Sequence, residues 1–149
     1  MSNGRLILGV VGVIGLGEAY RRWTTSKHDR LLKKAYKKAQ RAVGDDAEVT
    51  AEHGVGGEKG NRDLDGIDGH PDLVIKGFSA TNMIAEVETP DVIDNNPGHI
   101  IDQLEGYARQ RYKRVLIVPS GATDAAKELC QDIDGKVVVS TPSGVAELV

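Results

Sequence analysis

The chain has few cysteine and aromatic residues, and each shortage limits what the protein can be. Cys130 is the one cysteine among 149 residues, which excludes a disulfide framework and a four-thiolate zinc or iron–sulfur site. A single thiol also fits a reducing compartment. Aromatic residues make up 4% of the chain, so aliphatic side chains must fill the core. The length corresponds to one ordinary domain.

The apolar run at residues 6–17 (LILGVVGVIGLG) is shorter than the roughly 20 residues that a membrane-spanning helix needs. Arg21, Arg22 and Trp23 follow it, as basic and interfacial residues follow membrane segments. Residues 6–20 therefore have two interpretations: a membrane-associated segment, or a buried or oligomer-forming element. The first interpretation places the protein in the cytoplasm, anchored to the cytoplasmic face of the membrane. We expect residues 1–23 to form a separate hydrophobic segment and residues 24–149 to form the folded domain.

The charge of the chain is unevenly distributed. Residues 18–43 contain nine basic and two acidic residues, whereas residues 44–149 contain nine basic and 20 acidic residues. The basic segment fits either an anionic partner, nucleic acid or membrane, or the solvated face of a helix.

Hydrophobic periodicity predicts an α/β fold with a mixed sheet, in the order α-β-β-β-α-β-α-β. Helices are expected at residues 27–43, 98–112 and 123–133. Strands are expected at residues 47–55, 71–77, 83–89, 114–119 and 136–140. The run RVLIVP (114–119) is continuously apolar, which indicates a strand buried on both faces.

Two glutamates occupy the strand MIAEVET (83–89). Glu86 and Glu88 are two residues apart, so they project from one face of the strand. If residues 71–76 and 83–88 form a hairpin, Asp72 is expected across from Glu88. Three carboxylates within about 5–8 Å of each other repel unless a cation joins them. Oxygen ligands of this kind suit Mg²⁺ or Mn²⁺, so the pattern predicts a metal site.

These residues also resemble a known family. Pro71-Asp72, thirteen further residues and the E-x-E at 86–88 resemble the PD-(D/E)xK nuclease superfamily, which has the restriction-endonuclease-like fold. Gln103-x-x-x-Tyr107 in the following helix resembles the Q-x-x-x-Y motif of its RecB-like branch. The resemblance covers roughly residues 27–141.

The resemblance implies a metal-dependent nuclease that hydrolyses DNA phosphodiester bonds, as an endonuclease or otherwise. Asp72, Glu86 and the Val87 carbonyl would bind Mg²⁺ or Mn²⁺, and Gln103 and Tyr107 would position the site or the DNA strand. Glu88 stands where the family usually has a lysine, so it would act as a general base or recruit a second metal ion.

Other interpretations remain open. Glu88 in place of lysine also fits a catalytically inactive module that binds nucleic acid or a protein partner, at the membrane or as a homo-oligomer. Asn61, Asp63 and Asp65 have EF-hand spacing, which allows an unrelated calcium-binding loop at residues 61–72. Glu86 and Glu88 could also face solvent from an exposed sheet. Lys76 is either a relocated catalytic lysine or a solvated strand end.

Overall fold

The computed structural model describes residues 26–52, 55, 69–77, 82–108 and 112–149, which build a five-stranded mixed sheet. The strands lie in the order β1 (Ala47–Ala51), β2 (Leu73–Gly77), β3 (Asn82–Val87), β4 (Tyr112–Ile117) and β5 (Val137–Ser140). β1, β2 and β3 pair antiparallel, whereas β3–β4 and β4–β5 pair parallel. The predicted α/β class with a mixed sheet is confirmed.

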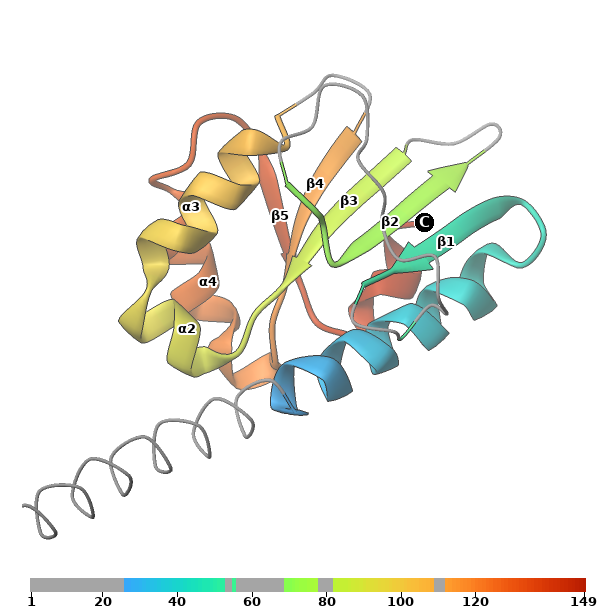
Figure 1. The fold of residues 1–149 in the computed structure, drawn as a ribbon, viewed down its shortest axis with the longest axis horizontal. Helices are drawn as coiled ribbons and strands as arrows, with labels where there is room; N and C mark the ends of the chain where they lie inside the picture. The colour runs from blue at the N-terminus through green and yellow to red at the C-terminus, as the bar shows by residue number, and fades with distance from the viewer. Residues whose placement is uncertain (1–25, 53–54, 56–68, 78–81, 109–111) are drawn as a thin grey trace, which may run out of the picture.

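Helices cover both faces of this sheet (Figure 1). Residues 26–43 form a helix, called here the basic helix, on one face. The other face carries α2 (Pro90–Asn95), α3 (Pro97–Gly106) and α4 (Thr123–Cys130). Because β3, β4 and β5 are parallel and adjacent, right-handed crossovers place their connecting helices on a single face. The opposite face is covered by the basic helix, and Val145 near the C-terminus packs in the same apolar layer.

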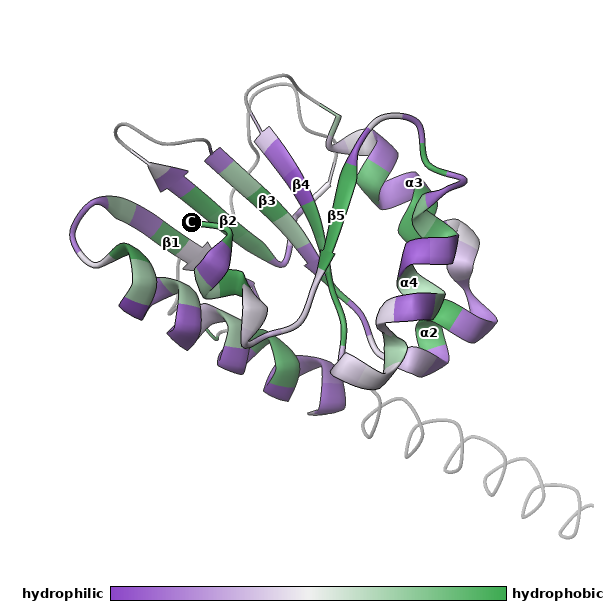
Figure 2. Ribbon diagram, turned by 180° about the vertical axis from the view of Figure 1, so that it is seen from behind, coloured by the Kyte–Doolittle hydropathy of each residue, from purple (hydrophilic) through white to green (hydrophobic). Residues whose placement is uncertain are grey.

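Two apolar layers hold the helices to the sheet. The basic helix buries Leu32, Ala35 and Ala39, whose spacing forms one helical stripe, against the β1–β4 side of the sheet. On the other face, Ile100 and Leu104 of α3 pack with side chains of β2, β3 and β4. Figure 2 shows the same division, with apolar colour on the strands and on the inward faces of the helices.

β4 is buried on both faces, as its continuous apolar run predicts. Its one buried charge is Arg114, which donates to the carbonyl oxygens of Leu104 and Asp134, each at 2.7 Å. These bonds tie the end of α3 to the loop that precedes β5. Gly135 in this loop has a φ of +84°, a conformation that favours glycine.

Several predicted boundaries are wrong. Pro90 follows the predicted strand at residues 83–89 and would only end it, but it begins the unpredicted α2, because proline fits the first position of a helix. α3 ends at Gly106 rather than at residue 112, and Tyr112 already belongs to β4. β1 ends at Ala51 rather than at residue 55. The short turns η1 (Ser120–Ala122) and η2 (Gly144–Glu147) were not predicted.

The β2–β3 hairpin exists, but its predicted register is wrong by two residues. Leu73 pairs with Ala85, so the register continued by one residue brings Asp72 beside Glu86 rather than across from Glu88. Where the strands turn, Gly77 donates its N–H to the side chain of Asn82 at 3.1 Å. A shift of two residues preserves the face of every side chain.

Two predictions concern residues outside the described part of the chain. These are the hydrophobic segment at residues 1–23, including residues 6–20, and most of the calcium-loop alternative at residues 61–72. Within the described ranges, no helix combines the length and apolar character required to cross a bilayer.

Candidate metal and active site

Three buried carboxylates meet where β2 begins and β3 ends. Asp72 precedes β2, Glu86 lies in β3 and Glu88 follows β3. Their residues are 5%, 2% and 7% exposed, so the alternative of glutamates facing solvent is wrong. The structure thus brings together the three acids that the sequence pattern selected.

Two hydrogen bonds position the first two carboxylates. The backbone N–H of Val87 donates to Asp72 Oδ2 at 2.9 Å, which holds that carboxylate against the end of β3. The hydroxyl of Tyr107 donates to Glu86 Oε1 at 2.6 Å. Tyr107 caps the end of α3 and is 1% exposed, so the helix on this face fixes the position of Glu86 directly.

His28 joins the site from the basic helix, and the sequence analysis missed it. Its Nε2 lies 3.0 Å from Asp72 Oδ2, and its Nδ1 lies 3.2 Å from Asp29 Oδ1. The available signal was periodicity, because His28 precedes the buried Leu32 and Ala35 by four and seven residues. A histidine on the apolar stripe of an otherwise basic helix must meet a polar partner inside the fold.

Burial and mutual repulsion dominate the electrostatics of the site. Burial, followed by the charge of Asp72, raises the pKa of Glu86 well above its usual value, although the Tyr107 hydrogen bond opposes the rise. Burial and Asp72 also raise the pKa of Glu88, to about 7, while His28 opposes this shift. Both glutamates therefore resist ionisation when no cation is bound.

The pKa of His28 shifts in the direction expected for a histidine beside acids. Burial lowers it, but hydrogen bonds to Asp72 and Asp29 and the charge of Glu88 prevail and raise it to about 9. His28 is thus an imidazolium at neutral pH and neutralises part of the negative charge. For Tyr107, burial and the adjacent Glu86 raise the pKa of the phenol, which stays a hydrogen-bond donor.

The remaining candidate residues are placed differently. Gln103 lies in α3, and its Oε1 is one of two buried side-chain atoms without a hydrogen-bond partner in the described residues; Thr89 Oγ1 is the other. His99, one turn earlier in α3, is exposed. The i, i+4, i+8 spacing of His99, Gln103 and Tyr107 predicts one polar stripe, but the structure divides these residues between surface and interior. Lys76 is also exposed at the far end of β2, as a solvated strand end would be.

The donor set fits a hard divalent cation. Asp72 and Glu86 offer carboxylate oxygens, and a bound cation would relieve the repulsion from Asp72 that helps to raise the pKa of Glu86. Within the described ranges, no three His, Cys, Asp or Glu side chains are already arranged around a common metal position. The predicted ligand set needs only two carboxylates and the Val87 carbonyl. Whether a cation fits this site therefore depends on Asp72 and Glu86.

Comparison with known proteins finds no family model, no curated protein and no solved structure that matches this chain.

Proposed function

We propose that this protein is a metal-dependent nuclease of the PD-(D/E)xK type. The observation that carries the proposal is the convergence of Asp72, Glu86 and Tyr107, which are bound into one buried cluster through Val87 and Tyr107. The motif spacing in the sequence picks out the same residues that the fold brings together. Ordinary surface residues with the same spacing would have no reason to converge in the interior.

The topology supports the finer fold assignment. Three antiparallel strands follow a helix, and a helix-bearing crossover then leads to a parallel strand. This agrees with the α-β-β-β-α-β order expected of a restriction-endonuclease-like core. The candidate acids also lie in or directly beside the adjacent strands β2 and β3 of that core, as the resemblance requires.

Asp72, Glu86 and the Val87 carbonyl would hold Mg²⁺ or Mn²⁺. Such an ion, when bound, supplies positive charge that stabilises the negative charge developing on the phosphate and lowers the pKa of a bound water. The protein fixes its ligands in advance. Val87 N–H and His28 hold Asp72, and Tyr107 holds Glu86.

Glu88 is the proposed proton acceptor. Its pKa of about 7 lies close to neutral pH. A general base with such a pKa is ionised in a large share of molecules and still has a high affinity for a proton. The position normally occupied by lysine would therefore carry a base that takes the proton from the attacking water. Gln103, whose Oε1 has no hydrogen-bond partner among the described residues, would orient the site or the substrate strand.

Digestion of labelled DNA tests the proposal. Linear and circular DNA, single- and double-stranded, would be incubated with Mg²⁺ or Mn²⁺ and with wild type, Asp72→Asn or Asp102→Asn. Asp102 is an exposed acid of α3, so its variant is the matched control. We expect metal-dependent cleavage by wild type and Asp102→Asn and a loss of at least about 100-fold in Asp72→Asn.

Cleavage by wild type and Asp72→Asn at equal rates would refute the assignment of Asp72. Cleavage of circular DNA would identify an endonuclease, whereas cleavage of linear DNA alone would identify an exonuclease.

A second function is favoured by one observation, the glutamate at position 88. Without the motif lysine, the same cluster could serve a catalytically inactive module that binds nucleic acid or a protein partner. In that case wild type cleaves no substrate, and Asp72→Asn leaves DNA binding unchanged. Calorimetric titration with Mn²⁺ separates the cases further, because only the nuclease requires the ion to bind.

A further inference from the structure

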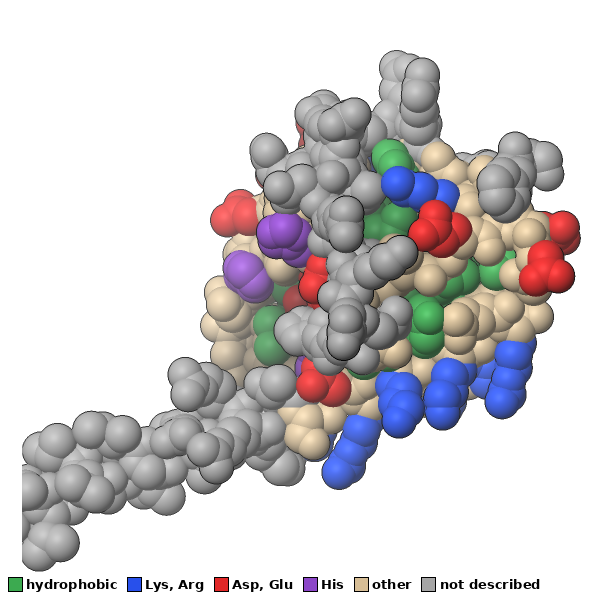
Figure 3. Space-filling view, turned by 45° about the vertical axis from the view of Figure 1, so that its right-hand side comes forward, with side chains coloured by type: hydrophobic (Ala, Val, Ile, Leu, Met, Phe, Trp, Pro, Cys, Tyr) green, Lys and Arg blue, Asp and Glu red, His purple; other side chains and the backbone are tan. Residues whose placement is uncertain are grey.

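The outer face of the basic helix carries a row of cations, which we call the cationic stripe. It consists of Lys27, Arg30, Lys33, Lys34, Lys37, Lys38 and Arg41. At 3.6 residues per turn these side chains fall within an arc of about 140° along about 21 Å of helix. Figure 3 shows Lys and Arg side chains gathered in a row along this edge of the molecule. Apart from the half-buried Lys38, they are exposed.

Six of the seven cations of the stripe pair with no acidic side chain among the described residues. Within the described part of the chain, Arg30, Lys33 and Arg41 form no salt bridge, and the same holds for Lys34, Lys37 and Lys38. Like charges this close together repel, so an isolated stripe is destabilising. An anionic partner would remove that repulsion on contact.

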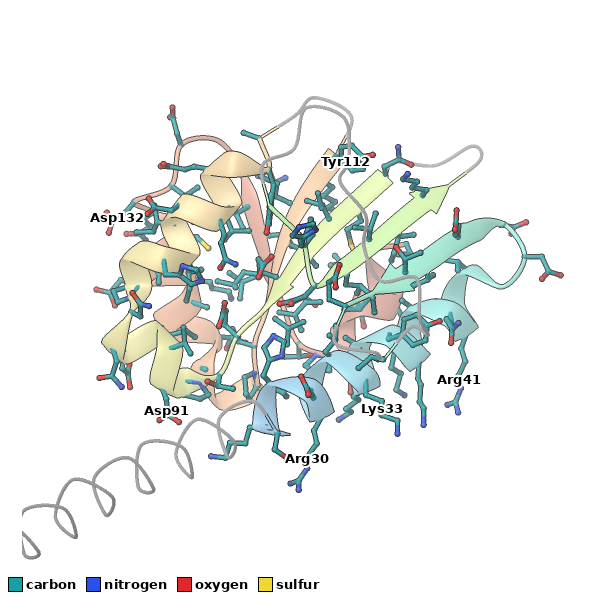
Figure 4. All side chains as sticks on the ribbon, in the orientation of Figure 1. Arg30, Lys33, Arg41, Asp91, Tyr112 and Asp132 are labelled. Atoms are coloured by element: carbon teal, nitrogen blue, oxygen red, sulfur yellow. The ribbon has the colours of Figure 1, made fainter. Side chains whose placement is uncertain are left out.

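The stripe faces away from the carboxylates. His28, which contacts Asp72, lies about 150° around the helix from the middle of the stripe. Figure 4 agrees, because the labelled Arg30, Lys33 and Arg41 project away from the sheet. A helix with its side chains is about 10–12 Å thick. The stripe is therefore separated from the reacting centre by the helix itself.

Because the cationic stripe lies on the outer side of the basic helix, it suits a partner with a flat anionic surface. Seven cations on one straight helix form a convex surface rather than a groove that encloses a nucleic-acid strand. The chain also has Arg21, Arg22 and Trp23 shortly before this helix, preceded by the apolar run at residues 6–17. Basic clusters next to an apolar segment are the pattern by which proteins recognise anionic lipid.

We propose that the cationic stripe docks on the anionic headgroups of a lipid bilayer. The basic helix would lie along the membrane surface, with the sheet and the carboxylate site on its far side. The inference does not depend on the proposed nuclease activity, because no residue of the stripe belongs to the site.

Vesicle co-sedimentation of the full chain tests this proposal. The probes are vesicles of phosphatidylcholine alone and vesicles with about 30 mol % phosphatidylserine. The test variant is Lys33→Gln/Lys37→Gln, and the control is Lys127→Gln/Lys136→Gln, which removes the same charge from exposed residues outside the stripe. We expect tighter binding to the anionic vesicles.

The stripe variant should bind anionic vesicles roughly 25-fold more weakly, at about fivefold per cation. The control variant should bind like wild type, and raising the salt to about 1 M should abolish the difference. Equal losses in both variants would overturn the proposal, since net charge alone would then explain binding. Equal binding to neutral and anionic vesicles would also overturn it.

Binding of the same variants to duplex DNA tests the alternative that the stripe is a nucleic-acid surface. If Lys33→Gln/Lys37→Gln weakens DNA binding at least as strongly as it weakens vesicle binding, the stripe is a nucleic-acid surface and the lipid assignment is wrong. If DNA binding is unchanged while vesicle binding falls, the lipid assignment stands.

Discussion

Neutralising Glu86 separates the electrostatic repulsion of the site from its packing. In the wild type, Tyr107 donates a hydrogen bond to Glu86 Oε1 at 2.6 Å. Glu86→Gln keeps the shape of the side chain and an oxygen that can accept this bond. The substitution removes an ionisable carboxyl whose side chain is 2% exposed and lies beside Asp72. The variant should therefore be more stable than wild type when divalent cations are absent.

The sign of the effect depends on pH. The pKa of Glu86 is raised in the folded state, so its carboxyl favours folding below the unfolded pKa of about 4.3 and loses that contribution as pH rises. At pH 8, well above the unfolded pKa, folding the wild type costs free energy, because this buried carboxyl beside Asp72 resists ionisation. We expect Glu86→Gln to gain about 1–3 kcal/mol of unfolding free energy there and little near pH 4.

Urea denaturation followed by circular dichroism, in a chelator at both pH values, measures this difference. Glu48→Gln, an exposed acid on β1, is the matched control and should change stability by less than about 0.5 kcal/mol. Adding Mg²⁺ or Mn²⁺ should then make wild type more stable than Glu86→Gln. At ten times its Kd a bound ion adds about 1.4 kcal/mol to wild type, whereas Glu86→Gln should gain much less.

A destabilised Glu86→Gln at pH 8 in chelator would refute the reasoning, because Glu86 would then be a net stabilising charge. Equal stabilisation of both proteins by the cation would refute Glu86 as a ligand.

Two further substitutions test neighbouring contacts. Tyr107→Phe should lower the free energy of unfolding by about 1–3 kcal/mol in chelator, because Glu86 loses its hydrogen-bond donor; a stability equal to wild type in urea denaturation would contradict this. Gly135→Ala should destabilise by more than about 1 kcal/mol, because its φ is +84° and a Cβ would lie 2.5 Å from Arg114 Nη2. The control Gly121→Ala meets no atom within 4 Å, so equal melting temperatures of the two glycine variants would contradict this reasoning.

Much of the fold follows from short-range patterns. The alternation in β1, the apolar run of β4 and the amphipathic stripe of the basic helix each give the correct element. α2 was missed because it is six residues long, which is too short for a periodic signal. Its first residue, Pro90, is compatible with both the end of a strand and the start of a helix.

The candidate site could be predicted in part for a geometric reason. Asp72 and Glu86 are 14 residues apart on one hairpin, so turn chemistry and strand periodicity are enough to bring them near each other. The error in register was two residues, which leaves every side chain on its face. A register error of one residue would have moved Glu86 to the face covered by the basic helix.

His28 could not be found in the same way, because it contacts Asp72 across 44 residues of sequence. That contact depends on how the basic helix crosses the sheet, which long-range packing decides. The same packing directs His28 inward and the cationic stripe outward, although both belong to one helix. A basic segment therefore does not show from its composition which side of a fold its charges serve. Here the buried Leu32, Ala35 and Ala39 fix the rotation of the helix, and that rotation separates the residue that holds the carboxylate from those proposed to meet the bilayer.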